Sequence, residues 1–215
     1  PGGVRRDVPD GFLERLSHTL DYRDSRLPEY ANLLFTPRVF VTRAIDTGKI
    51  CQKQALEWSV TGRYLRATGR AFVVRRDDPY LVYDQLEFDI PTEQAGDAWA
   101  RTLVRRAELQ QSVRILRQVI ERLPGIDGPI RAPIPNPLAW KVPAGEAYVR
   151  IESSKGELGW YVVSNGGEKP YRVHVRGPSA MHAVQVLEHL VTGCRIEDVA
   201  QIMFSLDACP PEVDR

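Results

Sequence analysis

The sequence predicts an α+β fold that is mainly helical: a bundle with one long central helix, plus a small antiparallel β-meander. Residues 97–123 place apolar side chains at steps of three and four, which is the period of an amphipathic helix. Residues 147–176 instead contain three short runs with strand character, separated by turns rich in Gly, Ser and Asn. Helical patterns precede and follow these strands.

The composition is that of an ordinary globular protein. The chain has 215 residues, enough for one substantial domain or two small ones, and is 43% hydrophobic and 27% charged. Lys and Arg minus Asp and Glu gives 29 − 28 = +1, so charge offers no case for nucleic acid or an acidic membrane as partner. No apolar run approaches the ~20 residues of a transmembrane helix.

Short helices are expected in the first part of the chain, at residues 12–20, 27–35 and 51–59. Pro37 ends the second, because the residue before a proline leaves the α region. Residues 39–45 fit either an extended or a helical segment. Residues 68–89 lack a helical period, and 75–80 form a charged, turn-rich loop.

The long helix at residues 97–123 begins at a plausible N-cap, Asp97, and a Pro-Gly pair follows its last turn. Arg101, Arg105 and Glu108 lie on neighbouring turns, at spacings that allow ion pairs. They form either a solvated, salt-bridged face or an interior arginine cluster beside a charged cofactor. The spacing alone favours the solvated face.

The chain divides into three parts. Residues 1–123 are the helical region, 124–145 form a proline-rich loop, and 146–215 hold the meander, two helices and a tail. The expected elements of the last part are strands at 147–151, 158–164 and 171–176 and helices at 180–191 and 196–205.

The tail, residues 207–215, combines a thiol, two prolines, three carboxylates and a final arginine. Because prolines reduce the number of unfolded conformers, this segment is predicted to have a defined shape and to dock at a specific place. The three cysteines, Cys51, Cys194 and Cys209, are far apart and form no CxxC pair. That spacing argues against a disulfide framework and against a self-contained zinc or iron–sulfur site.

No phosphate-binding glycine loop, HExxH or GxSxG motif is present. A series of weaker motifs carries more information through its order and spacing. Among them are Pro-Gly-Gly-Val at the start, Thr61-Gly62 before Leu65-Arg66-Ala67-Thr68-Gly69, Phe88-Asp89-Ile90-Pro91, Gly96-Asp97, Lys155-Gly156-Glu157-Leu158-Gly159, and Ser205-Leu206-Asp207 through Glu212-Val213-Asp214-Arg215.

Together these motifs resemble the quinone-site subunit (the 49-kDa or D type) of respiratory complex I, the proton-pumping NADH:ubiquinone oxidoreductase. This family is homologous to the large subunit of NiFe hydrogenases. The resemblance covers only the C-terminal part of the family. The histidine and tyrosine implicated in binding the quinone headgroup would lie before Pro1. We therefore expect one piece of a divided subunit, a partial domain that another chain completes.

The resemblance implies a place in the peripheral arm of the complex, on the matrix side of the mitochondrial inner membrane or the cytoplasmic side of a bacterial one. The chain would line the quinone cavity next to a terminal [4Fe-4S] cluster held by a partner subunit, and it would be inactive alone. Asp207, Glu212 and Arg215 are the candidate cavity-wall residues, and Lys155 and Arg105 the candidates near the cluster. For each of them, a structural salt bridge is the alternative.

Cys209 departs from the family pattern. Hydrogenase relatives have a nickel-ligating cysteine there, but one thiol without partners cannot make a nickel site. Cys209 is therefore predicted to be an inert, small core residue. Two rival hypotheses remain: a structural or assembly component of the same complex without a catalytic role, and a hydrogenase-like metalloprotein that would contain nickel. Expressed alone, the chain is expected to be insoluble or partly unfolded.

Overall fold

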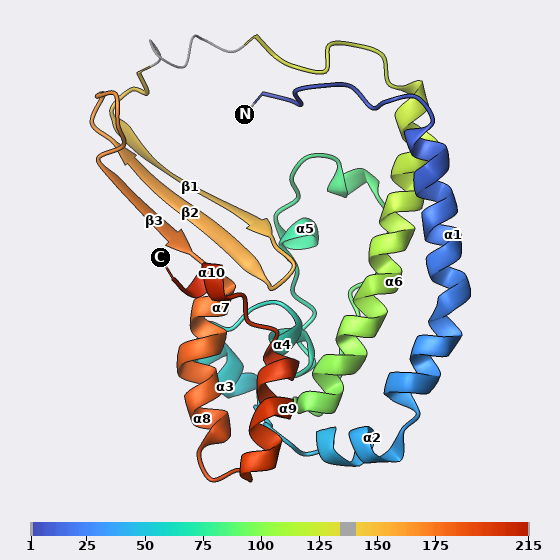
Figure 1. Cartoon of the computed structure of the whole chain (residues 1–215). Helices are drawn as coiled ribbons and strands as arrows, with labels where there is room; N and C mark the ends of the chain where they lie inside the picture. Colours follow the sequence, from blue (N-terminus) through green and yellow to red (C-terminus); the bar gives the residue numbers. More distant parts are fainter. Residues whose placement is uncertain (1, 134–140, 215) are drawn as a thin grey trace.

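The computed structural model describes residues 2–133 and 141–214 (Figure 1). Two long helices run side by side in opposite directions: α1, Phe12–Tyr30, and α6, Ala98–Arg122 (Figure 1). Asp97 begins α6 as predicted, because its Oδ1 atom accepts a hydrogen bond from the backbone N–H of Ala100 at 2.8 Å. The mainly helical α+β class is confirmed.

The other helices are short, and several of them meet around α6. They are α2 Arg38–Ala44, α3 Gln52–Glu57, α4 Arg63–Arg66, α5 Val74–Asp77, α7 Pro178–Met181, α8 Leu187–Val191, α9 Ile196–Leu206 and α10 Pro210–Val213. Two π-helical segments, Ala31–Phe35 and His182–Val186, extend α1 and join α7 to α8. Two 3₁₀ turns lie at Tyr83–Gln85 and Leu123–Gly125.

Two local predictions in the first part of the chain need correction, and one open alternative is decided. The separate helices at 12–20 and 27–35 are one continuous helical segment. The polar residues between them do not break it, because ion pairs such as Arg26–Glu29 and the pair from Asp21 to α6 occupy its exposed side. Residues 39–45 are helical, and the charged loop at 75–80 includes part of α5.

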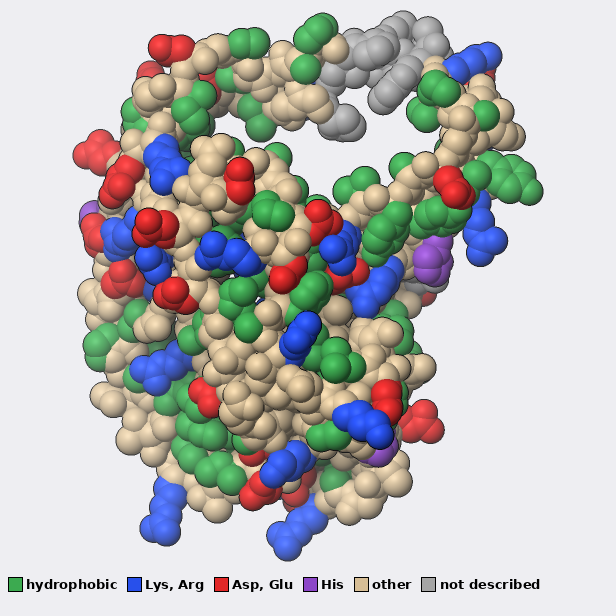
Figure 2. All heavy atoms as spheres, turned by 180° about the vertical axis from the view of Figure 1, so that it is seen from behind, with side chains coloured by type: hydrophobic (Ala, Val, Ile, Leu, Met, Phe, Trp, Pro, Cys, Tyr) green, Lys and Arg blue, Asp and Glu red, His purple; other side chains and the backbone are tan. Residues whose placement is uncertain are grey.

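The predicted meander is present as a sheet of three antiparallel strands in the order β1-β2-β3: β1 Gly145–Glu152, β2 Glu157–Ser164 and β3 Arg172–Arg176. Val149 pairs with Trp160, which pairs with Val175, so these three lie on one face. Val149 is 62% exposed and Trp160 47%. The view from behind shows hydrophobic side chains at the surface over the sheet, on the right (Figure 2).

The main hydrophobic core contains residues from before and from after the proline-rich segment. Its buried members are Ile50, Ala55, Val60, Tyr64, Leu65, Val186, Leu190, Ile202 and Leu206. Residues 134–140 of the proline-rich segment lie outside the described part of the chain. Within the described part, no helix combines the length and apolar character that a membrane span requires.

The accessible surface is large for the mass. It amounts to 14117 Å², whereas a compact monomer of 24.3 kDa is expected to expose about 10,000 Å². The excess is roughly 4,000 Å², and obligate interfaces bury about 2,000–5,000 Å² counted over both partners.

Candidate functional site

Asp207 is the centre of the candidate site. It ends α9 in the left-handed region, with φ 46° and ψ 39°, a conformation that Asp tolerates better than most residues. Its carboxylate forms ion pairs with three cations: with Arg63, with the Nζ atom of Lys155 at 2.7 Å, and with Arg105 at a looser 3.6 Å. Two predicted site residues, Lys155 and Arg105, therefore converge on a third.

The ion pairs continue inward from Arg63. Its Nε atom lies 3.9 Å from Glu108, which also accepts a 2.5 Å hydrogen bond from the Nε atom of Arg66. Arg66 in turn pairs with Glu152 on β1 at 3.2 Å. We call this set, Arg63, Arg66, Arg105, Glu108, Glu152, Lys155 and Asp207, the Asp207 network. It contains four cations and three carboxylates, so it carries one net positive charge.

The innermost members of the network are shielded from water, and the neighbouring cations decide the charge state of Asp207. The side chains of Arg66 and Glu152 are 5% and 3% exposed, and that of Asp207 is 18% exposed. Burial alone would raise the pKa of Asp207, but hydrogen bonds from Lys155 and Arg63 outweigh it and hold the pKa below its usual value. Asp207 is therefore ionised at neutral pH.

A close approach of two loops brings Arg63 and Lys155 to the same carboxylate. Gly62, directly before α4, has φ 70°, and a Cβ atom there would lie 2.3 Å from the carbonyl oxygen of Lys155. Thr61 fixes the contact by accepting a 3.1 Å hydrogen bond from the backbone N–H of Glu157. Only glycine allows the turn between β1 and β2 to come this near.

The prediction of a solvated salt-bridged face at Arg101, Arg105 and Glu108 was wrong for Arg101, whereas Arg105 and Glu108 do form ion pairs, with Asp207 and Arg66. Arg101 is 1% exposed and donates to the carbonyl oxygens of Gly96 and Gly48, each at 2.9 Å, and to the hydroxyl of Ser205. Burial lowers the pKa of Arg101 to about 10. At Arg101, α6 packs against α4 and α9.

Glu212 lies on the same tail but makes different contacts. Its Oε2 atom accepts hydrogen bonds from the hydroxyl of Ser179 at 2.6 Å and from the backbone N–H of Ser179 at 3.3 Å. The Ser179 hydroxyl in turn accepts from the backbone N–H of Cys209 at 3.0 Å. Ser179 is fully buried at the start of α7 and ties two points of the tail to that helix. Sequence reasoning missed it.

Two further predictions concern the tail. Cys209 is partly exposed and precedes α10, so the prediction of a core residue was wrong. Proline follows it and begins the short helix α10, which packs against α7. Arg215 lies outside the described residues, and its role stays a prediction.

In the described part of the chain, no three His, Cys, Asp or Glu residues gather in a way that could hold a metal ion.

A buried histidine, His182, lies near Arg63 of the network. The ring of His182 stacks on Tyr64 with centroids 4.1 Å apart, and both residues are 1% exposed. Burial, and then the positive charge of Arg63, lowers the pKa of His182 to about 3, so the ring is neutral at physiological pH.

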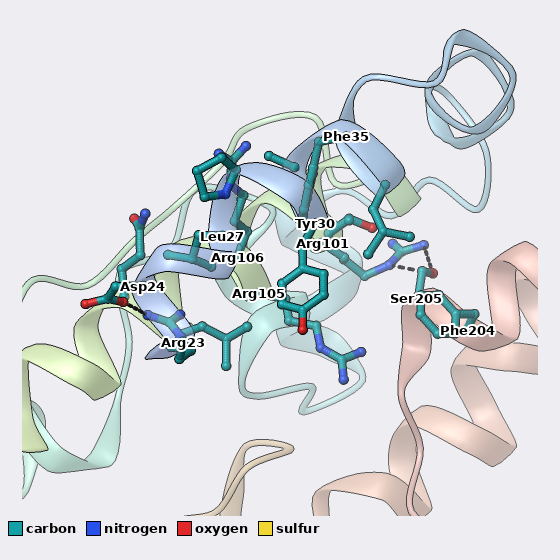
Figure 3. Close-up of a pocket in the computed structure, with 16 residues that line it drawn as sticks. Arg23, Asp24, Leu27, Tyr30, Phe35, Arg101, Arg105, Arg106, Phe204 and Ser205 are labelled. Atoms are coloured by element: carbon teal, nitrogen blue, oxygen red, sulfur yellow. Dashed lines mark hydrogen bonds and ion pairs between the residues drawn. The ribbon is translucent and has the colours of Figure 1, made fainter. Parts of the chain in front are cut away.

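Arg105 also borders a cavity of about 520 Å³ between the end of α1, α6 and the end of α9 (Figure 3). Its guanidinium carbon lies 5.9 Å from the ring centre of Phe204, which lines the same cavity. Arg105 therefore stands between the Asp207 network and this cavity.

The fold and the sequence match a known family of respiratory proteins. The family model for the 49 Kd subunit of respiratory-chain NADH dehydrogenase matches residues 1–139 and 136–215. The chain belongs to this family.

Named relatives agree with that assignment. The chain is 45% identical over 217 residues to the D-type subunit of NADH-quinone oxidoreductase from Thermosipho melanesiensis, covering 100% of the chain and 59% of the relative. It is 44% identical to a D-type subunit of the same enzyme from a Roseiflexus species, covering 100% and 58%. The chain therefore spans somewhat less than three fifths of the length of these relatives.

A solved structure matches closely as well. It is the membrane-bound sulfane sulfur reductase, described as an archaeal respiratory membrane complex. One of its chains superposes with a TM-score of 0.94 and 48% identity, over 100% of this chain and 58% of that one. Identity at this level supports comparison of individual residues as well as of the fold.

Proposed function

We propose that this chain lines part of the quinone-reduction cavity of a respiratory NADH:ubiquinone oxidoreductase. The cavity would lie next to a terminal [4Fe-4S] cluster that a partner subunit ligates. The observation that carries the proposal is the Asp207 network. It is a shielded group of charges at the end of the tail, in a chain whose curated relatives are named as D-type subunits of NADH-quinone oxidoreductase.

The chemistry of the reaction suits such a group. Reducing a quinone to a quinol takes two electrons and two protons, and electrons that arrive before protons place negative charge on the carbonyl oxygens. Preorganised cations in a water-poor site lower the cost of that charge. Lys155 and Arg105 are the candidates, because their side chains are 20% and 40% exposed while Arg63 is 10% exposed.

Asp207 would act by holding these cations in place. Removing its charge would leave Arg63, Lys155 and Arg105 to repel one another across a shared site, and they would separate. Lys155 would also influence a nearby cluster, since a positive group favours the reduced form. Glu212 would act indirectly, through Ser179, by fixing the tail that carries Asp207.

The partners follow from the same proposal. One is the cluster-bearing subunit, and another is the part of the 49-kDa type subunit that carries the family's histidine loop. The complex would be membrane-associated, with this chain on the matrix or cytoplasmic side. Flavin and NADH would bind elsewhere in the complex.

A second candidate function rests on the solved structure. A chain of a membrane-bound sulfane sulfur reductase is 48% identical to this one, a value similar to the 45% of the first quinone-linked relative. In this second function the same cations would face a sulfane sulfur substrate, whose reduction also develops negative charge.

Comparing electron acceptors decides between the two. The complex that contains this chain would be purified and assayed with NADH as donor, and with either a short-chain ubiquinone or polysulfide as acceptor. We expect NADH-dependent quinone reduction that a quinone-site inhibitor abolishes. Polysulfide reduction without quinone reduction would reject the proposal in favour of the second candidate.

A further inference from the structure

The turn that carries Lys155 joins β1 to β2, and a buried carboxylate stands at each of its ends. Glu152, the last residue of β1, pairs across the strands with Glu157, the first residue of β2. Their side chains are only 3% and 9% exposed. In Figure 1 this end of the sheet lies beside α5. Because buried carboxylates need cations, and Glu152 takes Arg66 of the Asp207 network, Glu157 requires partners of its own.

Side chains from both neighbouring strands hold Glu157. Its Oε2 atom lies 3.4 Å from Arg150 on β1, and its Oε1 atom lies 3.4 Å from Arg176 on β3. The hydroxyl of Tyr148 also donates to Oε1, at 3.3 Å. Tyr148 can reach this carboxylate because Gly159 leaves room for its ring: a Cβ atom at Gly159 would lie 2.2 Å from the hydroxyl. Three side chains therefore fix one carboxylate.

The same cluster joins the turn to the loop that precedes α4. Arg176 donates to the carbonyl oxygen of Ser59 at 2.9 Å and to that of Glu157 at 3.1 Å. Further along the loop, Arg63 donates to the carbonyl oxygen of Ser154 in the turn at 3.0 Å. The position of the turn relative to α4 therefore depends on the residues that hold β2 at Glu157.

Glu157 is separate from the Asp207 network itself. Within the described residues, its hydrogen-bond and ion-pair partners lie outside that network; they are Tyr148, Arg150, Arg176 and Thr61. Arg150 is also paired with Asp78 at 2.9 Å, so two carboxylates balance the two arginines of this cluster. With its charge offset locally, Glu157 acts on the network through the turn that it anchors.

We propose that Glu157 is a positioning residue for Lys155. By fixing the first residue of β2, it holds the Lys155 ammonium group within ion-pair distance of the Asp207 carboxylate. Without the charge of Glu157, Arg150 and Arg176 lose a shared counter-ion and repel each other, and the turn moves. The lysine side chain is flexible and 20% exposed, so it then turns toward water. The consequence for quinone reduction rests on the proposed function, whereas the geometry does not.

A cryo-EM structure of the assembled complex with Glu157→Gln tests the geometry. We expect the Nζ atom of Lys155 to lie more than 4 Å from the Asp207 carboxylate, with the other ion pairs of the network retained. Glu146→Gln is the matched control, because Glu146 accepts from the Tyr161 hydroxyl on the same sheet but is exposed and lies at the start of β1. An intact Lys155–Asp207 pair in Glu157→Gln would overturn the proposal.

A milder variant covers the case in which Glu157→Gln does not assemble. Glu157→Asp keeps the charge but withdraws the carboxylate by one methylene group from contacts that are already 3.3–3.4 Å long. The same displacement of Lys155 is expected, and an unchanged ion pair would again overturn the proposal.

A double-mutant cycle separates positioning from a general structural role. Glu157→Gln should lower kcat for ubiquinone at least fivefold, with KM and the ferricyanide activity within twofold of the wild type. In a Lys155→Met background the same substitution should change kcat by less than twofold, because the positioned group is gone. Equal losses in both backgrounds would overturn the proposal. Displacement of Lys155 with unchanged quinone reduction would support the positioning role and instead refute the function proposed for Lys155.

Discussion

The excess surface leads to a quantitative prediction about the isolated chain. The perturbation is to express residues 1–215 without any partner. The chain then exposes 14117 Å², about 4,000 Å² more than a compact monomer of its mass, and about 57% of protein surface is apolar. Burying even 400 Å² of apolar surface is worth about 10 kcal/mol, which equals the whole net stability of a typical domain.

We therefore expect the isolated chain to unfold without a sharp transition, to bind a hydrophobic dye such as ANS, and to aggregate. Differential scanning calorimetry and circular dichroism at several protein concentrations are the assays. The matched comparison is the complete subunit in its complex. A single cooperative melt of a monomer, with calorimetric and van't Hoff enthalpies equal, would refute the reasoning.

Three further predictions concern the interior of the complete subunit. His182 has a lower pKa in the folded protein than in the unfolded chain, so the unfolded chain binds a proton first as the pH falls. The free energy of unfolding should therefore decrease by about 1.4 kcal/mol per pH unit between pH 6.5 and about pH 3. Urea titrations of wild type and His182→Phe should therefore diverge by that slope, and parallel curves would contradict a buried neutral ring. Gly62→Ala should destabilise by several kcal/mol, because its Cβ would meet the Lys155 carbonyl at 2.3 Å, whereas Gly193→Ala, with φ +79° and open space, should cost about 1–2 kcal/mol. Equal losses of stability would reject that close contact. Ser179→Ala removes the hydroxyl that binds the tail and should speed maleimide labelling of Cys209, measured relative to the exposed Cys51. An unchanged ratio of the two labelling rates would show that Ser179 does not hold the tail in place.

Periodic features of the sequence were predictable, and contacts between distant segments were not. The long helix followed from Asp97 and its apolar period, and the meander from alternation, since both signals are local. Helical spacing shows which residues are neighbours on a helix but not which face is buried. For this reason Arg101 was assigned to solvent although it is buried.

The site shows the same limit. The resemblance pointed to Asp207, Lys155 and Arg105, which do converge. Arg63 was missed because it meets Asp207 from 144 positions away, and no local pattern reports such a contact. Ser179 could have been suspected from the Pro-Ser pair that opens a helix after a strand, although not its bond to Glu212.

The central claim is that the Asp207 network serves quinone reduction and is more than a structural salt bridge. Asp207→Asn in the fully assembled complex tests it most directly, with Asp214→Asn on the same tail as the control. We expect Asp207→Asn to lower NADH:ubiquinone reductase activity at least tenfold, while electron transfer from NADH to ferricyanide stays within twofold of the wild type. Unchanged kcat and KM for ubiquinone in an intact complex would contradict the claim and leave the chain a structural component.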